Sequence, residues 1–144
     1  MKQLHFQDIE WDIPELQGLK CCSFFGLSEN GADFNPDIIF IELSNGLWYR
    51  FFISAFLGVW SETQSADLAT IINEDFAGYF RIDYLKKYSL EGQPLKHVKC
   101  ETTDEGVLII LKFGVGYFII KPTDKSDPHS ESVFSFLPSK ELNY

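Results

Sequence analysis

Residues 37–53 read Asp37-Ile-Ile-Phe-Ile-Glu-Leu43, Ser44-Asn45-Gly46, Leu47-Trp-Tyr-Arg-Phe-Phe-Ile53. Asn-Gly between two runs of β-branched and aromatic residues is a strong hairpin signal, because both turn residues tolerate positive φ. Nearly every position of both runs is apolar. This predicts a hairpin that is covered on both faces, or covered on one face and in contact with a partner on the other.

A second unit of the same kind follows later in the chain. Residues 96–102 alternate, with Val98 and Cys100 on one face and charged residues on the other. Glycine-containing turns then separate two further apolar runs, at 107–113 and 117–121. Leu16-Gln-Gly18-Leu-Lys20 also resembles Leu90-Glu-Gly92 followed by Leu95-Lys96. The pattern predicts two three-stranded meanders, about residues 19–53 and 95–121, with chance likeness between hairpins as the alternative.

The segment between the two units predicts one short helix. Ser65–Asn73 has Ser65 as an expected N-cap, and Leu68, Ile71 and Ile72 form one apolar face. Segments 8–17 and 79–85 fit a strand or a helical turn equally well, and residues 132–137 fit an edge strand. We therefore expect one α+β domain over residues 1–144, mainly antiparallel, with five to seven strands and one or two short helices.

The charge of the chain is strongly negative and unevenly placed. The sequence has 21 acidic and 12 basic residues, for a net charge of −9. Residues 1–79 carry 12 acidic side chains and three basic ones, so this part alone accounts for the net charge. Such a chain lacks the basic patch of a nucleic-acid binder and is repelled by anionic membranes, so the expected partner is a basic protein. A solvated acidic face that only maintains solubility is the alternative.

Three features predict the cytoplasm as the location. The first 12 residues contain no apolar core of a secretory signal, and the longest apolar stretch, Val107–Ile120, is shorter than the ~20 residues of a membrane helix. The chain has three cysteines, Cys21, Cys22 and Cys100, and an odd number favours reduced thiols.

No constellation in the sequence indicates catalysis or metal binding. His97 and Cys100 are three residues apart on an expected strand and therefore point to opposite faces. Cys100 is expected on the apolar face, which is unfavourable for a reactive thiolate. Asp104 and Glu105 precede Gly106 in an expected turn, so turn formation accounts for them. We expect no enzyme, no catalytic residue, no cofactor and no metal.

Two tryptophans stand beside acidic residues and are candidate anchors for a partner. Trp11 lies among Asp8, Glu10 and Asp12, and Trp60 precedes Glu62. Aromatic residues dominate binding energy at interfaces, whereas charge sets the encounter rate; burial in the core is the alternative for each tryptophan. The expected partner-binding residues are Asp8, Glu10, Trp11, Asp12, Glu15, Trp60, Glu62, Asp67, Glu74 and Asp75.

The whole chain resembles the small cytosolic bacterial immunity proteins, which are antidotes to contact-dependent growth-inhibition and polymorphic toxins. The resemblance rests on single-domain size, on acidity in one half, and on the run Ile39–Ile53 followed by Gly58-Val-Trp-Ser-Glu62. It implies that a basic toxin domain, most often a nuclease, is bound and blocked by a monomer or homodimer.

An adaptor or regulatory subunit of a constitutive complex would instead expose a large apolar patch. A small enzyme or ligand-binding domain would instead show a deep pocket with convergent polar groups.

Overall fold

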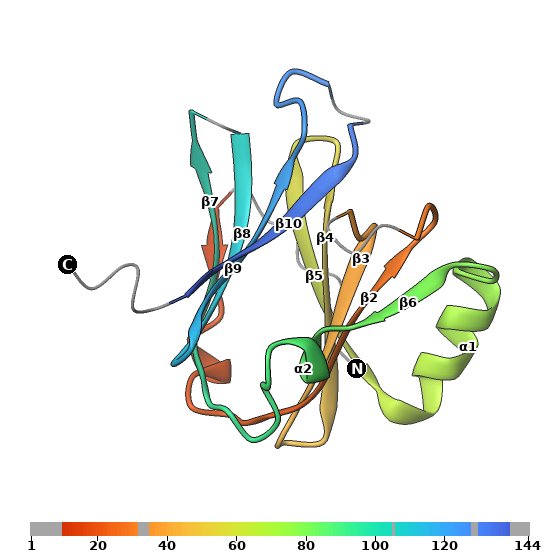
Figure 1. The fold of residues 1–144 in the computed structure, drawn as a ribbon, viewed down its shortest axis with the longest axis vertical. Helices are drawn as coiled ribbons and strands as arrows, with labels where there is room; N and C mark the ends of the chain where they lie inside the picture. Colours follow the sequence, from red (N-terminus) through yellow and green to blue (C-terminus); the bar gives the residue numbers. More distant parts are fainter. Residues whose placement is uncertain (1–9, 32–34, 105, 128–129, 139–144) are drawn as a thin grey trace.

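The computed structural model describes residues 10–31, 35–104, 106–127 and 130–138. Two five-stranded antiparallel sheets lie face to face (Figure 1). The strands of the first sheet are β2 (Cys21–Ser28), β3 (Ile38–Leu43), β4 (Leu47–Ser54), β5 (Leu57–Gln64) and β6 (Phe80–Asp83). Those of the second sheet are β1 (Trp11–Asp12), β7 (Leu95–Thr103), β8 (Gly106–Phe113), β9 (Gly116–Pro122) and β10 (Ser132–Pro138). The helices are η1 (Pro14–Leu16), α1 (Ser65–Asp75) and α2 (Tyr84–Lys87).

The expectation of a mainly antiparallel protein is confirmed, and the structure is more strongly β than an even α+β mixture. The expected number of five to seven strands was too low, because ten strands are formed in the described residues. Residues 132–138 form the expected edge strand, β10, beside β9.

The alternation of β4 shows how this sequence builds two cores. Tyr49 and Phe51 point toward the second sheet and join the main core between the sheets. Trp48 and Phe52 point the other way and pack in a second cluster beneath α1. The run is apolar at nearly every position because both faces of the strand are covered.

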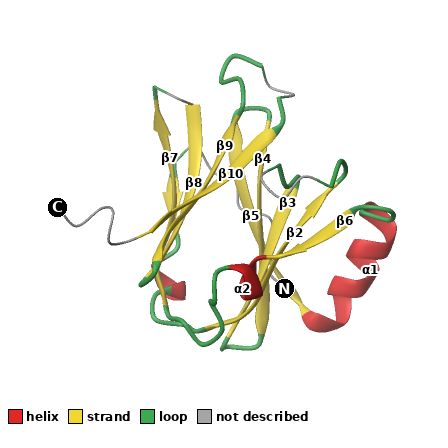
Figure 2. Ribbon diagram, viewed as in Figure 1, coloured by secondary structure: helices red, strands yellow, loops and turns green. Residues whose placement is uncertain are grey.

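Helix α1 covers the outer face of the first sheet (Figure 2). Leu68 is buried there against Phe40 and Trp48. The helix begins directly after β5, with Gln64 at the N-cap position and no side-chain cap bond. The expectation of Ser65 as N-cap was therefore wrong, because Ser65 is already the first helical residue.

The structure settles the two ambiguous segments. Within 79–85, strand β6 is followed directly by α2, which Asp83 caps by accepting a hydrogen bond from the Lys86 N–H at 3.2 Å. In the described part of 8–17, the strand β1 precedes one 3-10 turn that opens at Pro14.

The two sheets have the same plan. Each contains four strands that are consecutive in sequence. The first of these four also pairs with a short leading strand, meaning the strand with which the other half of the chain begins. Thus β1 pairs with β7 in the second sheet, and β6 pairs with β2 in the first. The expected meanders exist, but each has four strands, and each half contributes its leading strand to the opposite sheet.

The two halves meet at the Lys20–Pro94 bridge, and the contacts around it are reciprocal. The N–H of Gly18 donates to the carbonyl of Leu95 at 2.7 Å, and the N–H of Gly92 donates to the carbonyl of Cys21 at 2.8 Å. Gly18 and Gly92 have φ of +90° and +78°, the left-handed region that favours glycine. The arrangement therefore approximates a two-fold axis through the bridge.

Candidate interaction surface

The two candidate tryptophans lie together where β1 of one sheet faces β5 of the other. The ring centroids of Trp11 and Trp60 are 6.3 Å apart, and Trp11 also stacks on Phe51. The indole N–H of Trp11 donates to the carbonyl of Gly58 on β5 at 2.9 Å. Both tryptophans are half-buried, so they close the open side of the sandwich and still present part of their surface.

Four acidic residues lie on the elements that carry this aromatic pair or beside them. Glu10 and Asp12 flank Trp11 and are exposed, because side chains alternate along β1. Glu15 is exposed on η1, and Glu62 lies two residues after Trp60 on β5. We define the docking edge as these six residues, namely Glu10, Trp11, Asp12, Glu15, Trp60 and Glu62.

The electrostatics of Tyr49 show that acids of the docking edge converge from separate elements. Burial raises the pKa of the Tyr49 phenol, and a hydrogen bond from Asn45 opposes this rise. The negative charges of Glu62, on β5, and Glu15, on η1, raise the pKa further. Both carboxylates therefore act on one phenol from different parts of the chain.

The remaining expected residues do not share this surface. Asp67, Glu74 and Asp75 are exposed on α1, which covers the outer face of the first sheet. Asp75 acts on a different group: burial lowers the pKa of Arg50, and the charge of Asp75 opposes that lowering. Asp8 lies outside the described residues. The expected acidic surface is therefore divided between the docking edge and the helix.

Two of the three cysteines are buried structural groups, and the third is exposed. Burial raises the pKa of Cys21 to about 12 and that of Cys100 to about 11, so both thiols are protonated near neutral pH. Cys22 is exposed. Among the residues that the structure describes, no three His, Cys, Asp or Glu side chains gather as ligands for a metal ion.

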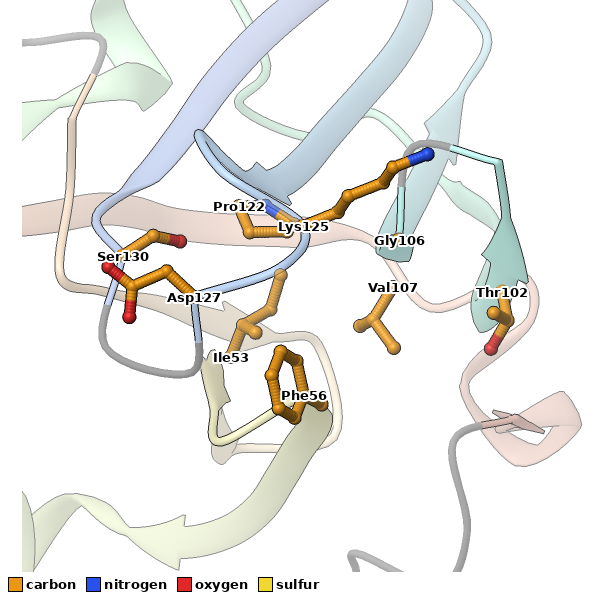
Figure 3. A pocket seen from close by; sticks show the side chains of 9 residues that line it. All are labelled: Ile53, Phe56, Thr102, Gly106, Val107, Pro122, Lys125, Asp127 and Ser130. Carbon is orange, nitrogen blue, oxygen red and sulfur yellow. The ribbon is translucent and has the colours of Figure 1, made fainter.

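A pocket that no sequence motif indicates lies at one end of the sandwich. Its volume is about 200 Å³, and its walls come from the β4–β5 turn, the β7–β8 hairpin and the β9–β10 connection (Figure 3). The lining residues are far apart in the sequence, so no local motif marks them. One local signal existed, which is a phenylalanine, Phe56, at the position of a hairpin turn.

In the described ranges of the chain, no helix is both long and apolar enough to cross a bilayer. Comparison of the chain with protein-family models, with curated proteins and with solved structures gives no match.

Proposed function

We propose that this chain is a non-enzymatic binding protein that neutralises a basic toxin domain, as immunity proteins do. The observation that supports the proposal is the docking edge, where two tryptophans held by packing lie among four carboxylates. Partly buried aromatic side chains supply binding energy at low entropic cost, because their conformation is already fixed. Surrounding negative charge accelerates the approach of a positively charged partner.

Charge reversal at two sites tests the proposal, because the chain offers a matched control. One variant replaces Glu10, Asp12 and Glu15 with lysine, and the other replaces Asp67, Glu74 and Asp75 with lysine. All six residues are exposed, and both variants change the net charge by the same amount. Only the place of the change differs, so a general charge effect is separated from docking.

The partner is first obtained by co-purification with the tagged chain, and it must inhibit growth when it is expressed alone. Association is then followed at low and at high salt. We expect reversal at the docking edge to slow association at low salt by at least about tenfold, and reversal on α1 to have a much smaller effect. Equal rates for the two variants, or a partner without toxicity, would overturn the proposal. Thermal unfolding of each variant checks that the fold is retained.

One observation favours a second candidate, an adaptor in a constitutive complex. The core-facing residues of β8 are buried, so Leu108 and Ile110 lie on its opposite face, where they are only half-buried. Helix α1 covers the first sheet, and no described helix covers this face of the second. An adaptor would associate through that face, and Leu108→Lys would then abolish co-purification while reversal at the docking edge would not.

A further inference from the structure

The pocket at the end of the sandwich has the size of a single side chain. Its volume is about 200 Å³, whereas pockets for drug-sized molecules measure about 300–1,000 Å³. Ile53, Phe56 and Val107 provide apolar walls from two hairpins. Figure 3 shows these three side chains converging on one space.

Lys125 forms a further wall without placing its charge inside. Its ammonium donates to the carbonyl of Asp104 on the opposite hairpin at 2.5 Å. The methylene chain therefore lies across the pocket, and the charge is held at the rim (Figure 3). The interior remains suited to an apolar group.

The turn that carries Phe56 is strained. Ala55 and Phe56 form a two-residue hairpin turn with φ of +49° and +71°. Two-residue turns with positive φ at both positions favour Asn-Gly, and at the β3–β4 turn of this chain the residue with positive φ is a glycine, Gly46. Phe56 is also 46% exposed. An exposed aromatic residue in a disfavoured backbone conformation does not serve stability, and such strain is concentrated at functional sites.

One buried polar atom that lines the pocket lacks a hydrogen bond among the described residues. The side-chain oxygen of Ser130 is buried and has no hydrogen-bond partner within the described ranges. Ser130 lines the same pocket as Phe56. Buried hydroxyl groups normally have a partner, so an occupant that brings one hydrogen-bonding atom would satisfy this group.

The pocket adjoins the docking edge. Thr102 lines the pocket, and its backbone N–H donates to the carboxylate of Glu10 at 3.3 Å. Ile53 lines the pocket and pairs with Gly58, whose carbonyl accepts the hydrogen bond from Trp11. A protein that covers the docking edge therefore reaches the mouth of the pocket.

We propose that this pocket binds one tyrosine side chain that the basic partner presents beside the docking edge. The ring packs between Phe56 and Val107, and the phenol forms a hydrogen bond with the Ser130 hydroxyl. The inference rests on the proposed function for the identity of the partner. The chemistry of the pocket is tested without the partner.

The first experiment follows amide signals of the isotope-labelled protein during titration with N-acetyl-tyrosine amide. We expect saturable shifts at residues of the pocket, binding of N-acetyl-phenylalanine amide that is about 2–10-fold weaker, and no binding of N-acetyl-alanine amide. Ser130→Ala should remove the preference for tyrosine over phenylalanine. Phe56→Ala should abolish binding, whereas Phe80→Ala, which alters another exposed phenylalanine on β6, should not. Absence of saturable shifts, or equal shifts with the alanine compound, would overturn the inference.

A pair of turn variants separates the role of Phe56 from its effect on folding. Ala55→Asn keeps Phe56, and Ala55→Asn with Phe56→Gly installs the favoured turn. We expect both variants to melt at a higher temperature than the original chain, and only the double variant to lose tyrosine binding. A double variant that is less stable, or that still binds, contradicts the assignment.

Rates with the purified partner distinguish this inference from the proposed function. Val107→Trp fills the pocket and should accelerate dissociation by at least about tenfold, with little change in the association rate. Reversal at the docking edge should mainly slow association. If the isolated pocket binds tyrosine and Val107→Trp leaves dissociation unchanged, the inference fails while the proposed function stands. If neither variant changes the rates, both fail.

Discussion

At the scale of single residues, Gly58 and Cys100 make a close contact between the two sheets. A Cβ atom added to Gly58 would collide with the sulfur of Cys100 on the opposite sheet. Both residues lie in the packed interior, which leaves no room for the additional group. The absence of a side chain at Gly58 is therefore a requirement of this interface rather than of the backbone conformation.

We expect Gly58→Ala to lower the free energy of unfolding by about 1–3 kcal/mol, because overpacking forces the sheets or side chains to shift. Urea denaturation provides the measurement. Cys100→Ala removes the colliding sulfur, so in the double variant the added cost of Gly58→Ala should be much smaller. Strictly additive losses would show that the collision is not the cause.

At the scale of elements, the two reciprocal loops make a symmetric prediction. Gly18 and Gly92 occupy equivalent places beside the Lys20–Pro94 bridge, and an added Cβ would meet no atom within 4 Å at either position. Any loss of stability when either glycine is replaced therefore comes from the positive φ alone. Gly18→Ala and Gly92→Ala should each lower stability by about 1–2 kcal/mol, and by similar amounts. Thermal or urea unfolding that affected one variant and spared the other would contradict the equivalence.

The elements of the fold differ in how far the sequence predicts them. Asn45-Gly46 and the alternation at Val98 and Cys100 are local signals, and the corresponding strands were predicted correctly. Strand β5 was missed because its turn uses Ala55-Phe56, residues that seldom adopt positive φ. The exchange of leading strands was also missed, because pairing partners such as Trp11 and Cys100 are distant in sequence.

The candidate surface was predictable only in part for the same reason. Trp11 and Trp60 each have acidic neighbours in the sequence, which predicts them as anchors, and the fold brings the two tryptophans together. The acids of α1 share the same composition but lie on the outer face of the first sheet. The composition of a segment predicts its charge. The face on which its acidic residues lie depends on the path of the chain through the fold, which composition does not give.

At the scale of the whole molecule, the buried thiols make stability depend on alkaline pH. The pKa values of Cys21 and Cys100 rise from 9.0 to about 12 and about 11. The unfolded chain therefore releases these protons at lower pH than the folded protein does. The stabilising contribution is complete below about pH 8 and is lost as the pH rises from about 9 through about 12.

Urea midpoints measured under reducing conditions across this range test the prediction. Cys100→Ala should lessen the loss of stability between neutral and alkaline pH, because one of the two groups is removed. Cys22→Ala should have a smaller effect, since Cys22 is exposed and its charge is a lesser cause, after burial, of the raised pKa of Cys21. Identical curves for the two variants would exclude the buried thiols as the cause.

The plan of the sheets also has a consequence for synthesis of the protein. All five strands of the first sheet lie between Cys21 and Asp83, whereas four of the five strands of the second begin at Leu95 or later. A nascent chain emerging from the ribosome can thus complete one sheet before its cover exists. At about 5–20 residues per second, the apolar face bearing Phe24 and Ile41 waits for seconds until β7 to β9 follow. During that interval the exposed apolar face is open to aggregation with other chains.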